Sequence, residues 1–407
     1  MKPKAVLAYC REKGIKAVDL RFVDVDGQWR HITFPLSALM ESSFEEGFGH
    51  EVLLDPQSDH PPSHAILLPH SEANYLDPFT SQPTLALLTT VQDALMRDEN
   101  VLDARCVARR AMQYLSSTSV GDGVLVRSSC PFRLSPLRKP VEEIVPDRST
   151  YLACGPSDRD FIFRCQIADL ASDSGLQVNR HLNGFGNSSE IHLKPAGLVE
   201  SSDDVMMLRY LVGQHAWRTD QNVSAENLWL NTQWSILRAG EPIFAGAVHR
   251  GLSEVGVHAM AGILRHADAI AAIATAHRQT QPEYSWLRIC SSTSVESVVR
   301  AAVASHNPRF RTVEFRGAPA DCNPYLVGSA VLMAMLDGIQ NKVSPGNALS
   351  ITIEGAADSI PWRIGQTNNN EFSPKALQSQ LDSDREFLTR GEVFGDELID
   401  VLCSRFD

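Results

Sequence analysis

One stretch, residues 312–346, constrains the fold of this chain more than any other part. It opens with an alternating run, Thr-Val-Glu-Phe-Arg, so a strand here would place Glu314 and Arg316 on one face and apolar residues on the other. Asn323 followed by Pro324 predicts a helix start, because an Asn side chain caps the first amides and proline suits the first helical position. The residues that follow are apolar on nearly every face, which indicates a helix buried in a large domain.

The composition excludes several classes of function. A chain of 407 residues with 43% hydrophobic and 21% charged residues can bury an ample core, in two or three domains or in one large one. Its formal net charge of -12 argues against a nucleic-acid partner, since phosphate neutralisation by Lys and Arg dominates such binding. No run approaches the ~20 apolar residues that span a bilayer, so no membrane partner and a cytoplasmic location are expected.

The eight cysteines are scattered along the chain, without a C-x-x-C pair or a matching histidine spacing. Such a distribution predicts reduced, structural thiols in preference to a zinc or redox site.

The N-terminal part of the chain predicts a small sheet domain. Strands are expected at residues 18–23, 29–34, 65–68 and 85–90. Asp26 and Gly27 between the first two are a strong hairpin signal. We expect a boundary near residue 98, which divides the chain into domains 1–98 and 99–407.

Four segments together resemble the glutamine synthetase family. They are Val-Asp-Leu-Arg-Phe at 18–22, Gly-Ile-Leu-Arg-His-Ala at 262–267, Asn-Pro-Tyr at 323–325 and Leu-Asp-Ser-Asp-Arg-Glu-Phe-Leu at 381–388. The resemblance covers nearly the whole chain and implies an α+β fold. It implies an N-terminal β-grasp domain, followed by a glutamine synthetase-type catalytic domain built from a curved antiparallel sheet with helices.

The resemblance also implies site residues and cofactors. Glu190, in an Asn-Ser-Ser-Glu-Ile segment, and Glu314 match metal ligands of the family, and Arg316 matches a phosphate contact. The family's reaction phosphorylates glutamate with ATP and lets ammonia displace the phosphate, with Mg²⁺ or Mn²⁺ bound at the site. Glu190 and His192 alternate along one strand face, and a hydrogen-bonded or solvated pair is the interpretation preferred over a transition-metal site.

Several family positions carry different residues here. Ser129 and Pro131 stand where the family has a Glu-x-Glu pair, and Leu182 stands where it has another ligand Glu. Asn231 and Gln233 occupy the positions of histidines. A hydroxyl and a prolyl ring cannot replace two carboxylates around Mg²⁺, which needs hard oxygen ligands in near-octahedral geometry.

Two further segments differ from the family. Phe48-Gly49-His50-Glu51 follows the Glu-Gly turn in place of the segment that contains the ammonium-binding Asp. The region 275–308 has no Gly-rich flap. Residues 295–305 are expected to be helical, and Arg288 and Arg300 are interpreted as surface or structural arginines.

Three hypotheses follow, and the sequence leaves open whether the chain is an enzyme. The first is a catalytically degenerate homologue, with Glu190, Glu314 and Arg316 as remnants of a site, that serves a structural, binding or regulatory role. It would assemble with itself as a ring-shaped homo-oligomer, or with an active glutamine synthetase. The second is a diverged ATP-dependent glutamate-ammonia or γ-glutamyl-amine ligase of nitrogen metabolism, with a metal bound by Glu190, His192 and Glu314. The third is a sensor that binds a nucleotide or amino acid through Arg316 without turnover.

Overall fold

The computed structural model describes residues 2–137, 150–249, 251–277, 298–303, 307, 311–345 and 373–406. The chain forms two compact units. The first comprises Met1–Cys106, Pro131–Lys194 and Ser202–Ser224, and the second comprises Val107–Cys130, Pro195–Ser201 and Ala225–Asp407. Each unit mixes helices and strands, which confirms the predicted α+β class, whereas the boundary near residue 98 stays a prediction.

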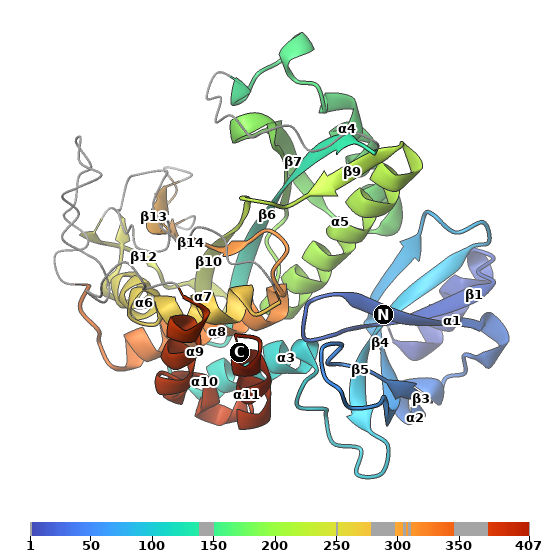
Figure 1. Cartoon of the computed structure of the whole chain (residues 1–407), viewed down its shortest axis with the longest axis horizontal. Coiled ribbons are helices and arrows are strands. Elements are labelled where there is room, and N and C mark those ends of the chain that lie inside the picture. Colours follow the sequence, from blue (N-terminus) through green and yellow to red (C-terminus); the bar gives the residue numbers. More distant parts are fainter. Residues whose placement is uncertain are drawn as a thin grey trace. The chain divides into compact units, whose positions relative to one another are not determined.

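The first unit begins with a sheet drawn in blue in Figure 1. Its elements are α1 (Pro3–Glu12), β1 (Ala17–Val23), β2 (Trp29–Pro35), η1 (Leu36–Ala38), α2 (Ser43–Glu46), β3 (Phe48–Val52), β4 (Ser63–Asp77) and β5 (Thr84–Asp93). Within the described residues the strand order is β2-β1-β5-β4-β3, with β1 and β5 parallel and the other pairs antiparallel. The predicted hairpin between β1 and β2 is confirmed, and Gly27 in its turn has a φ of 79°, a left-handed value that glycine adopts readily.

A buried cation explains the polar residues of strand β1. The Arg21 guanidinium donates to Asp19 at 2.7 Å and also bonds Asp77. Its Cζ atom lies 4.9 Å from the ring centroid of Trp29 and 4.3 Å from that of Tyr210. Two carboxylates and two aromatic rings therefore compensate a charge that would be costly to bury alone.

The remaining elements of the first unit follow the sheet in sequence. They are β6 (Gly123–Pro136), whose first half belongs to the second unit, η3 (Gly155–Ser157), α4 (Phe161–Ser174), β7 (Val178–Asn183), η4 (Phe185–Asn187), β8 (Ser189–Leu193), α5 (Leu198–Arg218), whose first turn belongs to the second unit, and β9 (Gln221–Ser224). Strand β7 pairs antiparallel with β8, and β9 pairs antiparallel with the end of β6. Helix α4 ends at Gly175, whose φ of 92° lies in the left-handed region typical of helix ends.

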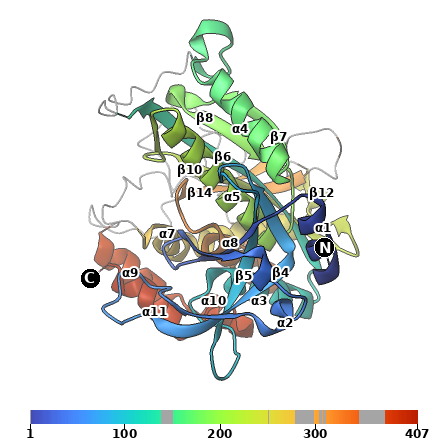
Figure 2. The same cartoon turned by 90° about the vertical axis from the view of Figure 1, so that its right-hand side faces the viewer.

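The second unit combines a sheet with most of the C-terminal helices. Its elements are α3 (Ala104–Ser117), β10 (Trp229–Arg238), β11 (Glu241–Pro242), β12 (Ala245–His249), α6 (Glu254–Arg265), α7 (Ala267–Thr275), β13 (Val299–Val303), β14 (Arg311–Pro319), α8 (Pro324–Gln340), α9 (Pro374–Ser383), α10 (Glu386–Thr389), η8 (Arg390–Glu392) and α11 (Asp396–Ser404). Strands β13, β14, β10 and β6 are neighbours in that order and antiparallel; Figure 2 shows β14, β10 and β6 from the side.

The prediction of a helix at residues 295–305 was wrong. Val299–Val303 forms strand β13, which pairs along β14, while residues 295–297 and 304–305 lie outside the described residues. Its valines are β-branched and suit a strand, and pairing with β14 decides the conformation.

Helix α8 has the cap and the burial that the sequence predicted. The Asn323 side chain accepts hydrogen bonds from the amides of Tyr325 and Leu326, and Pro324 is the first helical residue. A Cβ atom placed on Gly328 would lie 3.6 Å from the ring of Trp234 in β10, so α8 covers the face of the sheet that carries Trp234. Because side chains alternate along a strand, Gln233 projects from the opposite face.

A buried histidine joins the C-terminal helices to α6 and α8. The His266 ring contacts Asp384 through Nδ1 at 2.7 Å and Asp337 through Nε2 at 3.0 Å. Arg390 donates to Asp337 at 2.7 Å, and the Phe387 ring stacks on His266 with centroids 3.9 Å apart. Each ring nitrogen of His266 therefore has a carboxylate within hydrogen-bond distance. His266 thus serves packing and hydrogen bonding.

This network predicts a dependence of stability on pH. Burial acts to raise the pKa of Asp337, but the hydrogen bond from His266 and the charges of His266 and Arg390 outweigh it and lower that pKa. A depressed folded-state pKa contributes stability above the ordinary carboxyl value of about 4, and this contribution is lost as the pH falls through the folded-state pKa. We expect the difference in unfolding free energy between wild type and Asp337→Asn to be largest at pH 7 and to shrink steadily in acid.

Urea unfolding followed by circular dichroism at a series of pH values measures this difference. Glu12→Gln, at an exposed position of α1, is the control and should show a small difference throughout. A difference for Asp337→Asn that stays constant down to pH 3 would contradict the assignment.

Two further sequence predictions concern cysteines and membranes. Every cysteine in the described residues is a free thiol, and Cys290 lies outside them. No helix in the described parts of the chain is long and apolar enough to cross a membrane.

Candidate functional site

A row of polar side chains crosses four strands of the second unit. Arg127 of β6 pairs in register with Gln233 of β10, Gln233 with Glu314 of β14, and Glu314 with Arg300 of β13. Residues directly opposite each other on neighbouring strands project to the same face. These four residues, called the polar row below, therefore lie on the sheet face opposite Trp234 and α8.

Two side-chain hydrogen bonds connect the polar row. Arg127 Nη1 donates to Gln233 Oε1 at 3.2 Å, and Arg300 Nε donates to Glu314 Oε2. The Glu314 side chain is 0% exposed and that of Arg300 is 22% exposed. Since an isolated buried carboxylate is costly, the Arg300 guanidinium compensates the buried Glu314 side chain.

Two neighbours of the polar row stand at positions where the sequence resemblance implies a carboxylate and a histidine. Ser129 of β6 lies opposite Asn231 of β10, so a hydroxyl and an amide share the face with Glu314. The Asn231 Oδ1 and Glu314 Oε1 atoms are buried and lack a hydrogen-bond partner among the described residues. This group offers Mg²⁺ one carboxylate, one amide and one hydroxyl. Mg²⁺ in proteins is usually bound by one or two carboxylates together with substrate phosphates and water, so this set has fewer charged oxygen ligands.

The first unit contains the other predicted ligand. Glu190 lies on β8, where Glu190 Oε2 is 3.4 Å from His192 Nε2. On β7, Leu182 is the register partner of Glu190 and Arg180 that of His192. Thus the two family ligand positions Leu182 and Glu190 are neighbours, and an apolar side chain occupies one of them.

The described residues contain no group of three or more His, Cys, Asp or Glu side chains arranged to hold a metal ion. Taken alone, the described residues do not fit the divalent metal that the family resemblance implies. Glu190 and Glu314 as ligands therefore stay predictions from the sequence.

Arg316 follows Glu314 by two residues on β14, so both project from the same face. Its backbone amide donates to the carbonyl of Val298 at 2.8 Å. Its predicted phosphate contact stays a prediction. The sequence interpretation missed the roles of Arg127 and Arg300 in the polar row, because neither stands in a motif and only the strand pairing brings them to Gln233 and Glu314.

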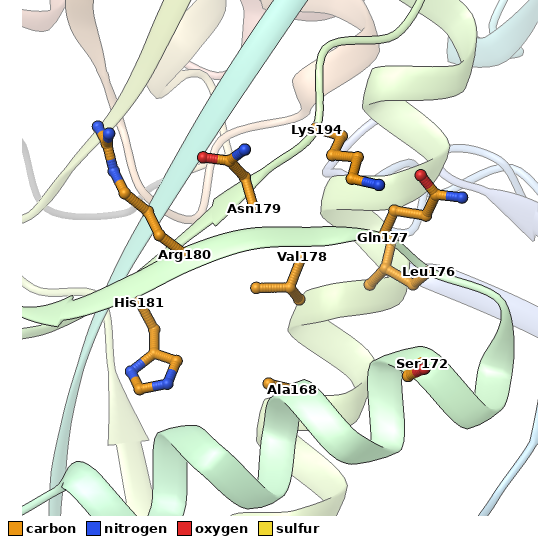
Figure 3. A pocket seen from close by; sticks show the side chains of 9 residues that line it. All are labelled: Ala168, Ser172, Leu176, Gln177, Val178, Asn179, Arg180, His181 and Lys194. Carbon is orange, nitrogen blue, oxygen red and sulfur yellow. The ribbon is translucent and has the colours of Figure 1, made fainter.

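A separate hollow lies between α4 and β7 in the first unit. It has a volume of about 700 Å³ and is lined by residues that include Ala168, Ser172 and His181. Figure 3 shows the His181 ring pointing toward α4, whereas Asn179 and Arg180 point to the other side of β7. None of the described residues that line the hollow carries a carboxylate.

These features define a class of α+β protein. Its antiparallel sheet has one polar face and packs against a buried helix on the other face. Residues 102–404 match the family model described as glutamine synthetase, catalytic domain. The chain belongs to the glutamine synthetase family.

Individual relatives agree with this assignment. The chain is 28% identical to a glutamine synthetase of Aquifex aeolicus, over 98% of this chain and 93% of that protein. It is 30% identical to one of Methylococcus capsulatus, over 98% of this chain and 94% of that protein. Its fold is similar to that of Plasmodium falciparum glutamine synthetase, with a TM-score of 0.80 at 16% identity, covering 99% of this chain and 95% of that one.

Proposed function

We propose that this chain is a catalytically degenerate member of the glutamine synthetase family with a structural, binding or regulatory role. The observation that carries the proposal is the pairing of Glu314 with Arg300 inside the polar row. In the family, by resemblance, a carboxylate in this position helps to hold a metal that neutralises charge on the transferred phosphate. In this chain an arginine already compensates Glu314, while Ser129 and Asn231 replace a carboxylate and a histidine.

The expected loss of rate is large. Removing a single oriented donor from a transition state commonly costs about 3 kcal/mol. Here four of the six ligand positions implied by the resemblance carry other residues: Ser129, Pro131, Leu182, and the metal-binding histidine's position, which is one of the two that Asn231 and Gln233 occupy. Even when such losses are far from additive, little catalysis should remain.

The alternative is a diverged ATP-dependent glutamate-ammonia or γ-glutamyl-amine ligase in nitrogen metabolism, with Mg²⁺ or Mn²⁺ and ATP as cofactors. Two observations favour it: the 3.4 Å contact between Glu190 and His192, and the buried Oε1 of Glu314 that lacks a hydrogen-bond partner among the described residues. The Glu190–His192 pair and the Glu314 Oε1 atom each offer lone pairs that would bind a cation.

An activity assay tests the proposal. Purified chain with Mg²⁺ or Mn²⁺, ATP, glutamate and ammonium is expected to release no phosphate above a protein-free blank. The Methylococcus capsulatus glutamine synthetase, assayed in parallel, is the positive control. Phosphate release within about 100-fold of that control would overturn the proposal, since the lost interactions predict a far larger deficit.

Two further arms separate the remaining hypotheses. Turnover with a polyamine or another amine in place of ammonium would support the γ-glutamyl-amine ligase. Heat released on titration with ATP or glutamate, without turnover, would support a sensor that binds its ligand through Arg316.

The partner that we infer is a second copy of this chain in a ring, or an active glutamine synthetase, in the cytoplasm. The family resemblance supports this inference. Co-expression with an active glutamine synthetase, followed by mass measurement of the purified assembly, distinguishes self-assembly from co-assembly.

A further inference from the structure

A cysteine and a histidine meet where α4 packs on β7. Cys165 Sγ lies 3.8 Å from Nε2 of His181, and both side chains are half-buried. The other ring nitrogen, Nδ1, accepts a hydrogen bond from Arg164 Nε at 3.4 Å. Arg164 is fixed in turn by Asp158 at 2.5 Å and by Ser189 at 3.1 Å.

The arginine determines which nitrogen of His181 carries the proton. A guanidinium only donates, so Nδ1 acts as the acceptor and the proton of the neutral ring resides on Nε2. Burial, followed by the charge of Arg164, lowers the pKa of His181 and favours this neutral ring. The Nε2–H group then faces Cys165 Sγ and donates to it, and hydrogen bonds of this kind are strongest when the acceptor is charged.

The hollow beside α4 reaches the His181 member of this pair. His181 lines it together with Ala168 and Ser172 (Figure 3), and Ala168 lies one helical turn beyond Cys165. The side chains of Ala168 and Ser172 are small and leave the space next to the His181 ring open. Most other described cysteines are buried, and only Cys154 is exposed.

We propose that Cys165 is a modification site, a thiol activated by His181 and reached through the hollow between α4 and β7. It reacts with small oxidants such as hydrogen peroxide, or with small electrophiles. With peroxide, the thiolate sulfur attacks one oxygen, the S–O bond forms and the O–O bond breaks. Hydroxide leaves and takes up a proton to become water, so the sulfur is oxidised to a sulfenic acid and the peroxide is reduced.

The modification would act on strand β7. An oxygen or alkyl group added to Sγ would lie between α4 and β7, and β7 also carries Leu182, the register partner of Glu190. The inference does not depend on whether the chain is an enzyme.

Peptide mass spectrometry after timed exposure to iodoacetamide, and separately to hydrogen peroxide, tests the proposal on the full chain. Cys154 is the internal control, because it is exposed. In native protein, Cys165 is expected to react faster than Cys154 despite its lower exposure. His181→Gln should slow Cys165 by about tenfold, the worth of a hydrogen bond to a charged sulfur, and leave Cys154 unchanged.

Unfolding the wild-type chain in urea supplies a control that needs no variant. The ratio of the Cys165 rate to the Cys154 rate should fall to about one, because the His181 contact is lost with the fold. A native ratio at or below one would overturn the proposal. So would a Cys165 rate that is the same in wild type and in folded His181→Gln.

Discussion

Replacing Gly262 with alanine is expected to destabilise the chain by about 3 kcal/mol, at the upper end of what overpacking costs. Gly262 lies where α6 crosses α8. A Cβ atom at this position would lie 2.0 Å from the carbonyl oxygen of Ala334 and 2.9 Å from the Cα of Gly338. A Cβ on Gly338 would in turn lie 2.2 Å from the carbonyl oxygen of His258. The atoms met are backbone atoms, so the two helices would have to move apart.

Gly213→Ala in α5 is the matched control, because a Cβ atom there meets nothing within 4 Å. Alanine is the better helix former, so this variant should gain roughly 0.5–1 kcal/mol. Urea unfolding followed by circular dichroism measures both changes. If Gly262→Ala unfolds at the same urea concentration as wild type, the helix crossing is looser than the distances indicate.

The elements that the sequence predicted correctly depend on local chemistry. Asn323 and Pro324 start α8 through contacts within one helical turn, and Asp26 with Gly27 forms the β1–β2 turn. The close crossing at Gly262 depends on a residue 76 positions away, Gly338. No local pattern distinguishes such a glycine from one that could become alanine, such as Gly213.

The candidate site likewise contains residues that sequence motifs locate and contacts that only strand pairing creates. Family motifs located Ser129, Asn231 and Glu314, and the strand register places the first two opposite each other. The role of Arg300 could not be predicted, because its segment was expected to be helical. The ion pair joins residues 14 positions apart on two paired strands, so the contact exists only once β13 lies beside β14.

Arg300→Ala is expected to cost about 3 kcal/mol of unfolding free energy, because removing one partner leaves the other charge buried without compensation. Glu314 is 0% exposed and Arg300 is 22% exposed, so solvent screens the pair little. Adding Glu314→Gln to Arg300→Ala should restore much of the loss, since the uncompensated charge disappears. Urea unfolding of the two single variants and the double variant gives the coupling energy directly.

The same variants test whether Arg300 takes the place of a metal ion as the counter-charge of Glu314. If Arg300 is the counter-charge of Glu314, Mn²⁺ should leave the unfolding temperature of wild type unchanged but raise that of Arg300→Ala, because the carboxylate then needs a cation. The double variant should not respond, as it lacks both charges. Stabilisation of wild type by Mn²⁺ equal to that of Arg300→Ala would mean that a metal binds despite Arg300, which would favour the ligase over the degenerate homologue.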